Sequence, residues 1–105
     1  MAQFDVYDNP NPQARQWLPY VVDVQSNLLS DLRTRLVMPL SRSVVEPPAS
    51  ARRVAPVFVV EGERLVLQAQ LTAHLDARRL GKRRSSLIGH LGEIRDALDV
   101  VISGV

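Results

Sequence analysis

The sequence predicts a small, mainly β domain of the α+β class with one helix at its C-terminal end. Short runs rich in β-branched residues recur along most of the chain, and several alternate apolar with polar residues as half-buried strands do. The pattern then changes to intervals of three and four residues, which indicate an amphipathic helix. A chain of 105 residues can form one hydrophobic core. We therefore expect residues 1–105 to form a single domain.

The strands are expected wherever β-prone runs lie between turn-forming residues. Two prolines in residues 9–12 end the first run, and a turn containing Gly62 separates the two runs of the clearest hairpin. Residues 41–55 have no steady period and are interpreted as a long excursion. The expected strands are 4–7, 18–25, 35–40, 57–60 and 64–70, with residues 73–76 continuing the sheet.

The final segment has apolar residues on one face of a helix. Ser85 or Ser86 is the expected N-cap of this helix. Asp96 and Asp99 lie near its end, where carboxylates oppose the helix dipole. Two interpretations of them stay open: they face a partner, or they lie on a solvated face where Arg95 offsets their charge. The apolar residues are Leu87, Leu91, Ile94, Leu98, Val101 and Ile102.

The composition is that of an ordinary globular protein, with 46% hydrophobic and 23% charged residues and no cysteine. We expect neither disulfides nor thiol chemistry, no membrane span and no secretory signal, and therefore a cytoplasmic protein. His74 and His90 lack metal-ligand spacing, and no glycine-rich phosphate loop or nucleophile elbow is present. We expect no metal, no cofactor and no catalytic residues.

A cationic run lies just before the helix. Five of its seven residues are basic: Arg78, Arg79, Lys82, Arg83 and Arg84. Such a run can bind nucleic acid, hold an acidic protein segment, or form a solvated loop. No aromatic residue lies within it, so a platform for stacking bases is not expected.

Several segments together resemble the CcdB family of plasmid and chromosomal toxins. They are Gln3–Tyr7, Val21–Leu29, Thr34–Leu40, Pro56–Val57 and Ile94–Asp99, followed by an Ile-Ser-Gly-Val ending. The resemblance implies an SH3-like barrel with a small additional sheet and a C-terminal helix, assembled as a homodimer. It also implies a toxin that wedges into the A subunit of DNA gyrase and traps the enzyme on cut DNA, without itself breaking a bond. A role in plasmid maintenance goes with that activity.

The resemblance also implies which residues bind gyrase. The family pattern has a tryptophan where this chain has Ser103, and another aromatic residue where it has Ile102. For Val105, docking on a partner and folding back on its own barrel both stay open. The residues expected to contact gyrase are Leu28, Leu29, Asp99, Ile102, Ser103, Gly104 and Val105.

Toxins of this family are neutralised by an antitoxin with a disordered acidic tail, and a sequence pI near 9.7 suits such a partner. The expected contacts are Arg52, Arg53, Arg78, Arg79, Lys82, Arg83 and Arg84. Nucleic acid is expected to be bound only through the antitoxin complex. Two alternatives stay open: an endoribonuclease toxin of the MazF type, and a CcdB relative that binds its antitoxin but has lost gyrase toxicity.

Overall fold

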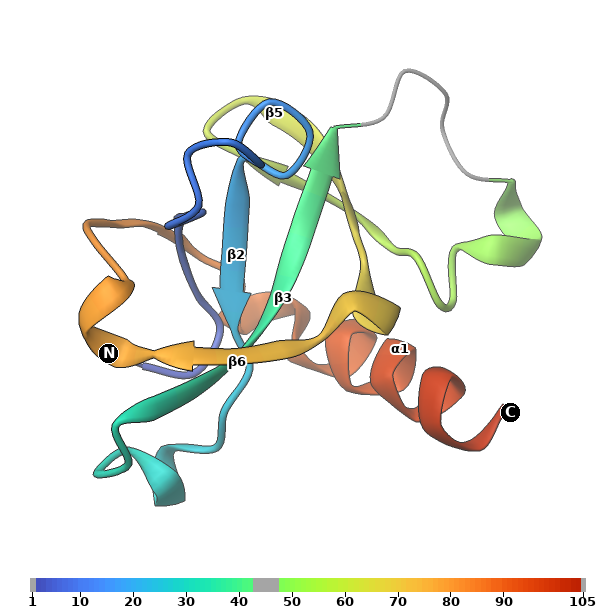
Figure 1. The fold of residues 1–105 in the computed structure, drawn as a ribbon. Helices are drawn as coiled ribbons and strands as arrows, with labels where there is room; N and C mark the ends of the chain where they lie inside the picture. Colours follow the sequence, from blue (N-terminus) through green and yellow to red (C-terminus); the bar gives the residue numbers. More distant parts are fainter. Residues whose placement is uncertain (1, 43–47, 105) are drawn as a thin grey trace.

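The fold is a mainly antiparallel β half-barrel followed by one helix (Figure 1). The computed structural model describes residues 2–42 and 48–104. Six strands lie in the order β4-β5-β3-β2-β1-β7, and β6 is an extra strand on β3, which confirms the predicted fold class. The strands are β1 (Asp5–Asp8), β2 (Tyr20–Asp23), β3 (Thr34–Arg42), β4 (Val57–Val60), β5 (Glu63–Leu67), β6 (Ala73–Asp76) and β7 (Arg83–Ser86). The helix is α1 (Leu91–Ser103), and the 3-10 turns are η1 (Asn27–Leu29), η2 (Ala49–Ala51), η3 (Ala69–Leu71), η4 (Ala77–Arg79) and η5 (Ile88–His90).

Strand β3 joins the half-barrel to the extra strand. Near its end Leu40 lies opposite Leu67 of β5, and at its start Thr34 lies opposite Asp76 of β6. Strand β2 pairs with the other side of β3. Figure 1 shows β6 crossing in front of β3 at that lower end. One nine-residue strand therefore serves two neighbours on the same side.

The hairpin of β4 and β5 forms as predicted, with a turn that contains Gly62, but the turn has two residues because β5 begins at Glu63 and not at residue 64. Glu61 and Gly62 have φ angles of 51° and 81°, the left-handed conformations that match the twist of a tight hairpin. The prediction that the second strand reaches residue 70 was wrong. Strand β5 ends at Leu67, because the chain then turns through η3, which buries Ala69 and packs on both α1 and β3.

The two faces of the sheet carry different apolar clusters. The larger cluster lies between the half-barrel and α1. The smaller one lies on the opposite face, where Tyr7, Val21 and Val37 pack with Leu75 of β6 and with Leu80. The larger cluster contains Phe4, Val6, Val22, Met38, Leu40, Phe58, Val60, Leu65, Leu67, Ala69, Leu87, Ile94 and Ala97. Burial of each large apolar side chain contributes about 1.5–3 kcal/mol, so this cluster dominates the stability of the fold.

The segment before the helix differs from the prediction. Strand β7 was not expected, and it pairs with β1 although it lies partly in the cationic run. The helix begins at Leu91, with His90 at the cap position and no side-chain capping bond. Ser85 and Ser86 lie in β7 instead, and the Ser86 hydroxyl accepts a hydrogen bond from the Ile88 N–H at 3.3 Å. The predicted serine cap of the helix was therefore wrong.

The buried face of α1 is narrower than the predicted stripe. Ile94 and Ala97 are buried, and Leu98 packs against them at the edge. Val101 and Ile102 are exposed instead of buried, since the sheet does not extend beneath the last turn (Figure 1). An apolar helix end therefore projects from the half-barrel.

An ion pair is buried on the face of the smaller cluster. Arg35 of β3 and Asp23 of β2 are 1% and 0% exposed. The Arg35 Nε donates to Asp23 Oδ2 at 2.8 Å, and Nη2 lies 2.7 Å from the same oxygen without hydrogen-bond geometry. Burial raises the pKa of Asp23, while the guanidinium and the Gln25 amide act in the opposite direction. Burying either charge without the other would be strongly unfavourable, so the stability of each buried residue depends on its partner.

We expect Arg35→Met to lower the free energy of unfolding by about 3–5 kcal/mol, because it leaves the Asp23 carboxylate buried without its cation. The exposed neighbour Arg33 provides the control, and Arg33→Met should change stability by less than about 0.5 kcal/mol. Urea unfolding at one protein concentration measures both. Equal losses in the two variants would show that the buried pair has no special role.

Candidate functional site

The turn η1 presents an exposed leucine doublet. Leu28 and Leu29 are 94% and 49% exposed. The Ser26 hydroxyl accepts a hydrogen bond from the Leu28 N–H at 3.2 Å, and Asn27 Oδ1 accepts one from the Gln3 N–H at 3.0 Å. A turn fixed in this way offers a small apolar surface to a partner.

Gln25 ties this turn to the sheet. Its side-chain Nε2 donates to the Leu29 carbonyl at 2.9 Å, and its Oε1 accepts from the Leu36 N–H at 3.0 Å. Its own N–H donates to Asp23 Oδ1 at 3.0 Å. The hydrogen bonds therefore run from the buried ion pair to the doublet. This network gives the Val-Asp-Val-Gln-Ser motif a physical role, which is to hold the exposed leucines.

The end of α1 forms a second exposed surface. The Ser103 hydroxyl donates to the Asp99 carbonyl at 2.6 Å, so it is used within its own helix. Gly104 has a φ of 73° and closes the helix in the left-handed conformation, with its N–H donating to the Val100 carbonyl at 2.8 Å. Ile102 is 73% exposed. The glycine thus fixes the direction in which the chain leaves the helix.

The two surfaces lie apart within one protomer. In Figure 1 the cyan turn η1 is at the lower left, and the C-terminal end of α1 is at the far right. The structure therefore does not bring Leu28 and Leu29 together with Ile102 and Ser103. Val105 lies outside the described residues, so both predictions for its side chain stay predictions.

Arg53 binds the helix directly. Its Nε lies 2.9 Å from Asp96 Oδ2 and its Nη2 lies 3.2 Å from Oδ1, in a two-bond arrangement. The guanidinium lowers the pKa of Asp96. The charge that offsets Asp96 comes from Arg53, not from Arg95 as the sequence suggested. This pair fastens the segment after η2 to the middle of α1.

The cationic run is largely paired with carboxylates. Arg78 holds the pKa of Asp76 well below its usual value. Arg79 and Lys82 make no ion pair with any of the described residues. The closest N–O distances are 2.8 Å for Arg78 with Asp76, 3.0 Å for Arg83 with Asp5, and 2.9 Å for Arg84 with Asp8. The run is therefore not the uniform positive patch that its sequence suggests.

The basic residues expected to bind an antitoxin form two separate groups. Arg52 and Arg53 follow η2, close to α1. The run of residues 78–84 lies on the opposite side of the molecule, in the orange segment of Figure 1. The structure does not join them into one surface.

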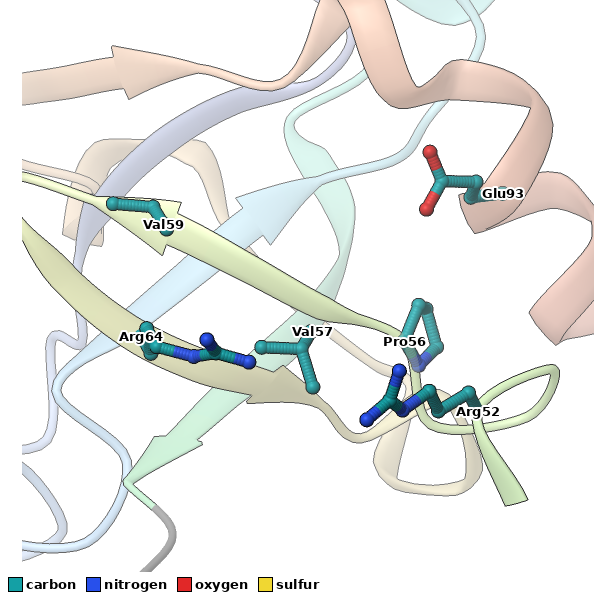
Figure 2. A pocket seen from close by; sticks show the side chains of 6 residues that line it. All are labelled: Arg52, Pro56, Val57, Val59, Arg64 and Glu93. Atoms are coloured by element: carbon teal, nitrogen blue, oxygen red, sulfur yellow. The ribbon is translucent and has the colours of Figure 1, made fainter. Parts of the chain in front are cut away.

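A hollow of about 390 Å³ lies beside Arg52 (Figure 2). Val57 and Val59 of β4 form its apolar part, with Pro56 at one end. Its charged residues are Arg52, Arg64 of β5 and Glu93 in the first turn of α1. Of these residues, Arg52 was the one predicted from the sequence to bind a partner. For Val57 and Val59 the available signal was the alternation along β4, which places both on one face.

The described residues contain no group of three histidine, cysteine, aspartate or glutamate side chains placed to hold a metal ion. Over the same ranges, no helix is long and apolar enough to cross a membrane.

Comparison with known families matches residues 3–104 to the CcdB protein family. The chain belongs to the CcdB family. No curated protein matches the chain. Membership implies a CcdB-like toxin, and it confirms the expectation that the chain is not an enzyme, because CcdB family toxins are non-enzymatic gyrase poisons.

Both surfaces implied by the CcdB resemblance are exposed in the structure. The leucine doublet rests on the Gln25 network, and the helix end rests on the Gly104 cap. Ser103 bonds to its own backbone and offers no aromatic side chain to a partner. Both exposed segments are therefore held in place by hydrogen bonds, and position 103 carries no aromatic side chain.

Gly104→Ala should loosen the last helical turn, because a left-handed conformation costs an L residue about 1–2 kcal/mol. No atom lies within 4 Å of an added Cβ, so backbone strain is the sole cause. We expect amide exchange at residue 104 to rise about fivefold or more, measured by NMR. D-alanine at this position should restore protection.

Gly92→Ala is the matched control. Its added Cβ also meets nothing within 4 Å, but Gly92 has no positive φ. This variant should raise stability by about 0.5 kcal/mol. Faster exchange at residue 104 in both variants would contradict a role for the left-handed cap.

Proposed function

We propose that this protein is a gyrase-poisoning toxin of a type II toxin-antitoxin module. The observation that carries the proposal is the pair of exposed apolar surfaces, each held by fixed hydrogen bonds, on a member of the CcdB family. The gyrase A subunit is the partner, and the cytoplasm is the compartment in which the two meet. The residues in contact are Leu28, Leu29, Asp99, Ile102, Ser103, Gly104 and Val105.

A homodimer is part of this proposal. Leu36 of β3, Leu71 of η3 and Val101 of α1 are 37%, 48% and 40% exposed. The turn η3 packs against both β3 and α1, so these side chains come from adjoining elements. An apolar surface of this kind favours self-association. A two-fold axis near it would place two helix ends side by side.

An acidic antitoxin is the second partner. The chain carries a net charge of +2. Arg79 and Lys82, which form no ion pair within residues 2–42 and 48–104, add to the basic groups beside α1. Electrostatic attraction favours association with an acidic tail. Nucleic acid is bound by the complex of toxin and antitoxin, and not by the toxin alone.

Ser103 supports a second candidate function, an antitoxin-binding relative without gyrase toxicity. Tryptophan is among the side chains that dominate binding energy at interfaces, and truncating such an anchor costs at least about 2 kcal/mol. The Ser103 hydroxyl is already bonded to Asp99. A serine here supplies neither apolar area nor a free donor to gyrase.

The test is a DNA cleavage assay with purified gyrase, ATP and supercoiled plasmid. We expect linear DNA with the natural protein, and we expect Ser103→Trp to give it at about tenfold lower concentration because an aromatic anchor is restored. Deletion of residues 103–105 should abolish the product. Arg95→Gln, on the exposed side of the same helix, should leave it unchanged.

The other outcomes decide between the alternatives. Linear DNA from Ser103→Trp alone would mean a disarmed toxin on an intact scaffold. No linear DNA from either protein, together with cleavage of added RNA, would replace the proposal with a ribonuclease of the MazF type.

A further inference from the structure

The hairpin of β4 and β5 leaves one strand with an open edge. Strand β4 lies at the end of the sheet order and pairs with β5 alone among the described residues. Side chains alternate along this strand: Phe58 and Val60 lie in the core, while Val57 and Val59 face the hollow (Figure 2). Val59 is 61% exposed.

The pairing register identifies the backbone groups at this edge. Val60 lies opposite Glu63 next to the two-residue turn, so this pair and every second pair beyond it exchange hydrogen bonds. The bond from the Leu67 N–H to the Pro56 carbonyl, at 2.9 Å, fits the same alternation. Val57 and Val59 belong to the other set of pairs. Their N–H and carbonyl groups therefore point outward, away from β5.

Charge lies beside these outward groups. Among the described residues, the Arg52 and Arg64 side chains line the hollow with one carboxylate, Glu93, which is 2.9 Å from His90 Nδ1. Both guanidiniums already interact within the chain. Each guanidinium has five N–H donors, however, so a further acceptor can be bound. The rim of the hollow thus attracts carboxylates, and its base is apolar.

We propose that an extended acidic peptide adds to β4 as a further strand. Its backbone would pair with the outward groups of Val57 and Val59, and its alternate side chains would meet the hollow. Carboxylates there would bind Arg52 and Arg64, and apolar side chains would cover the two valines. Strand addition of this type takes affinity from main-chain hydrogen bonds and specificity from alternate side chains.

This binding is separable from gyrase poisoning. The acidic tail of an antitoxin is one peptide with the required chemistry. Identifying the peptide as an antitoxin tail rests on the proposed function, whereas the binding of an acidic peptide to β4 does not. The β4 edge contains none of the residues assigned to gyrase. Variants of the edge should therefore leave the DNA cleavage assay unchanged, whether or not a peptide binds.

The probe is an acetylated and amidated nine-residue peptide with threonine at every even position and with glutamate and valine in turn at the odd positions, so that one face of the strand carries both. It is titrated into isotope-labelled protein at low salt. We expect saturable binding and at least about tenfold slower hydrogen exchange at the Val57 and Val59 amides. The same peptide with lysine in place of glutamate should not bind. No saturable binding of the acidic peptide, or binding that leaves both amides unprotected, overturns the proposal.

Substitutions separate the backbone contribution from the charge contribution. Val59→Pro removes an outward donor without removing a bond to β5, and it should weaken peptide binding at least about tenfold. Val59→Thr keeps the N–H and should bind within about threefold of the natural protein.

Arg64→Gln tests the charge contribution, and Arg33→Gln is its matched control. Both variants remove one charge from an exposed arginine, but of the two only Arg64 lines the hollow. We expect about a fivefold loss of affinity for Arg64→Gln and less than twofold for Arg33→Gln. Equal losses would show attraction by net charge alone and would overturn the assigned site. This comparison stands even if Val59→Pro does not fold.

Discussion

The buried ion pair between Asp23 and Arg35 is the constraint on which much of the structure depends. It joins β2 to β3 on the face of the smaller cluster, where Leu75 of β6, the cross-strand partner of Arg35, also packs. One pairing register places both charges in contact, and a shift by one residue would turn Arg35 to the other face. We infer that this pair contributes mainly to the choice of register, since burying two charges gains little net stability.

The same pair explains why a surface turn is well fixed. Asp23 accepts a hydrogen bond from the Gln25 N–H, and the Gln25 side chain holds the carbonyl of Leu29 and the N–H of Leu36. Order in the core therefore continues to the exposed leucine doublet through side-chain hydrogen bonds. A surface fixed before binding loses less conformational entropy on association.

Local sequence patterns predicted the parts of the fold whose apolar residues recur with the period of the element they form. The β4–β5 hairpin was predictable because β-branched runs flank a turn containing Gly62. Strand β7 was not, because Arg-Arg-Ser-Ser has no apolar alternation. It pairs with β1 through its backbone, and Arg83 and Arg84 also form ion pairs with Asp5 and Asp8 of β1, 78 and 76 residues away in the sequence.

The candidate site was predictable only in part. The position of Gly104 matched its family pattern, and its left-handed φ agrees with that assignment. The ion pairs of the basic run could not be predicted from the sequence, because their carboxylates lie in the strands β6 and β1, and two of them are 78 and 76 residues away. Exposure at Val101 and Ile102 was also unpredictable from period alone. Helical spacing says which residues share a face, not where the sheet beneath that face ends.

The two open edges of the half-barrel differ in their chemistry. Strand β7 carries Arg83 and Arg84, and charged side chains are a common protection against the addition of another strand. Strand β4 carries Val57 and Val59 on its open face, and among the described residues the charged side chains that line the adjacent hollow are Arg52, Arg64 and Glu93. A purely structural edge would need the protection that β7 has. The apolar β4 edge, flanked by cations, is instead suited to one class of partner, an acidic extended chain.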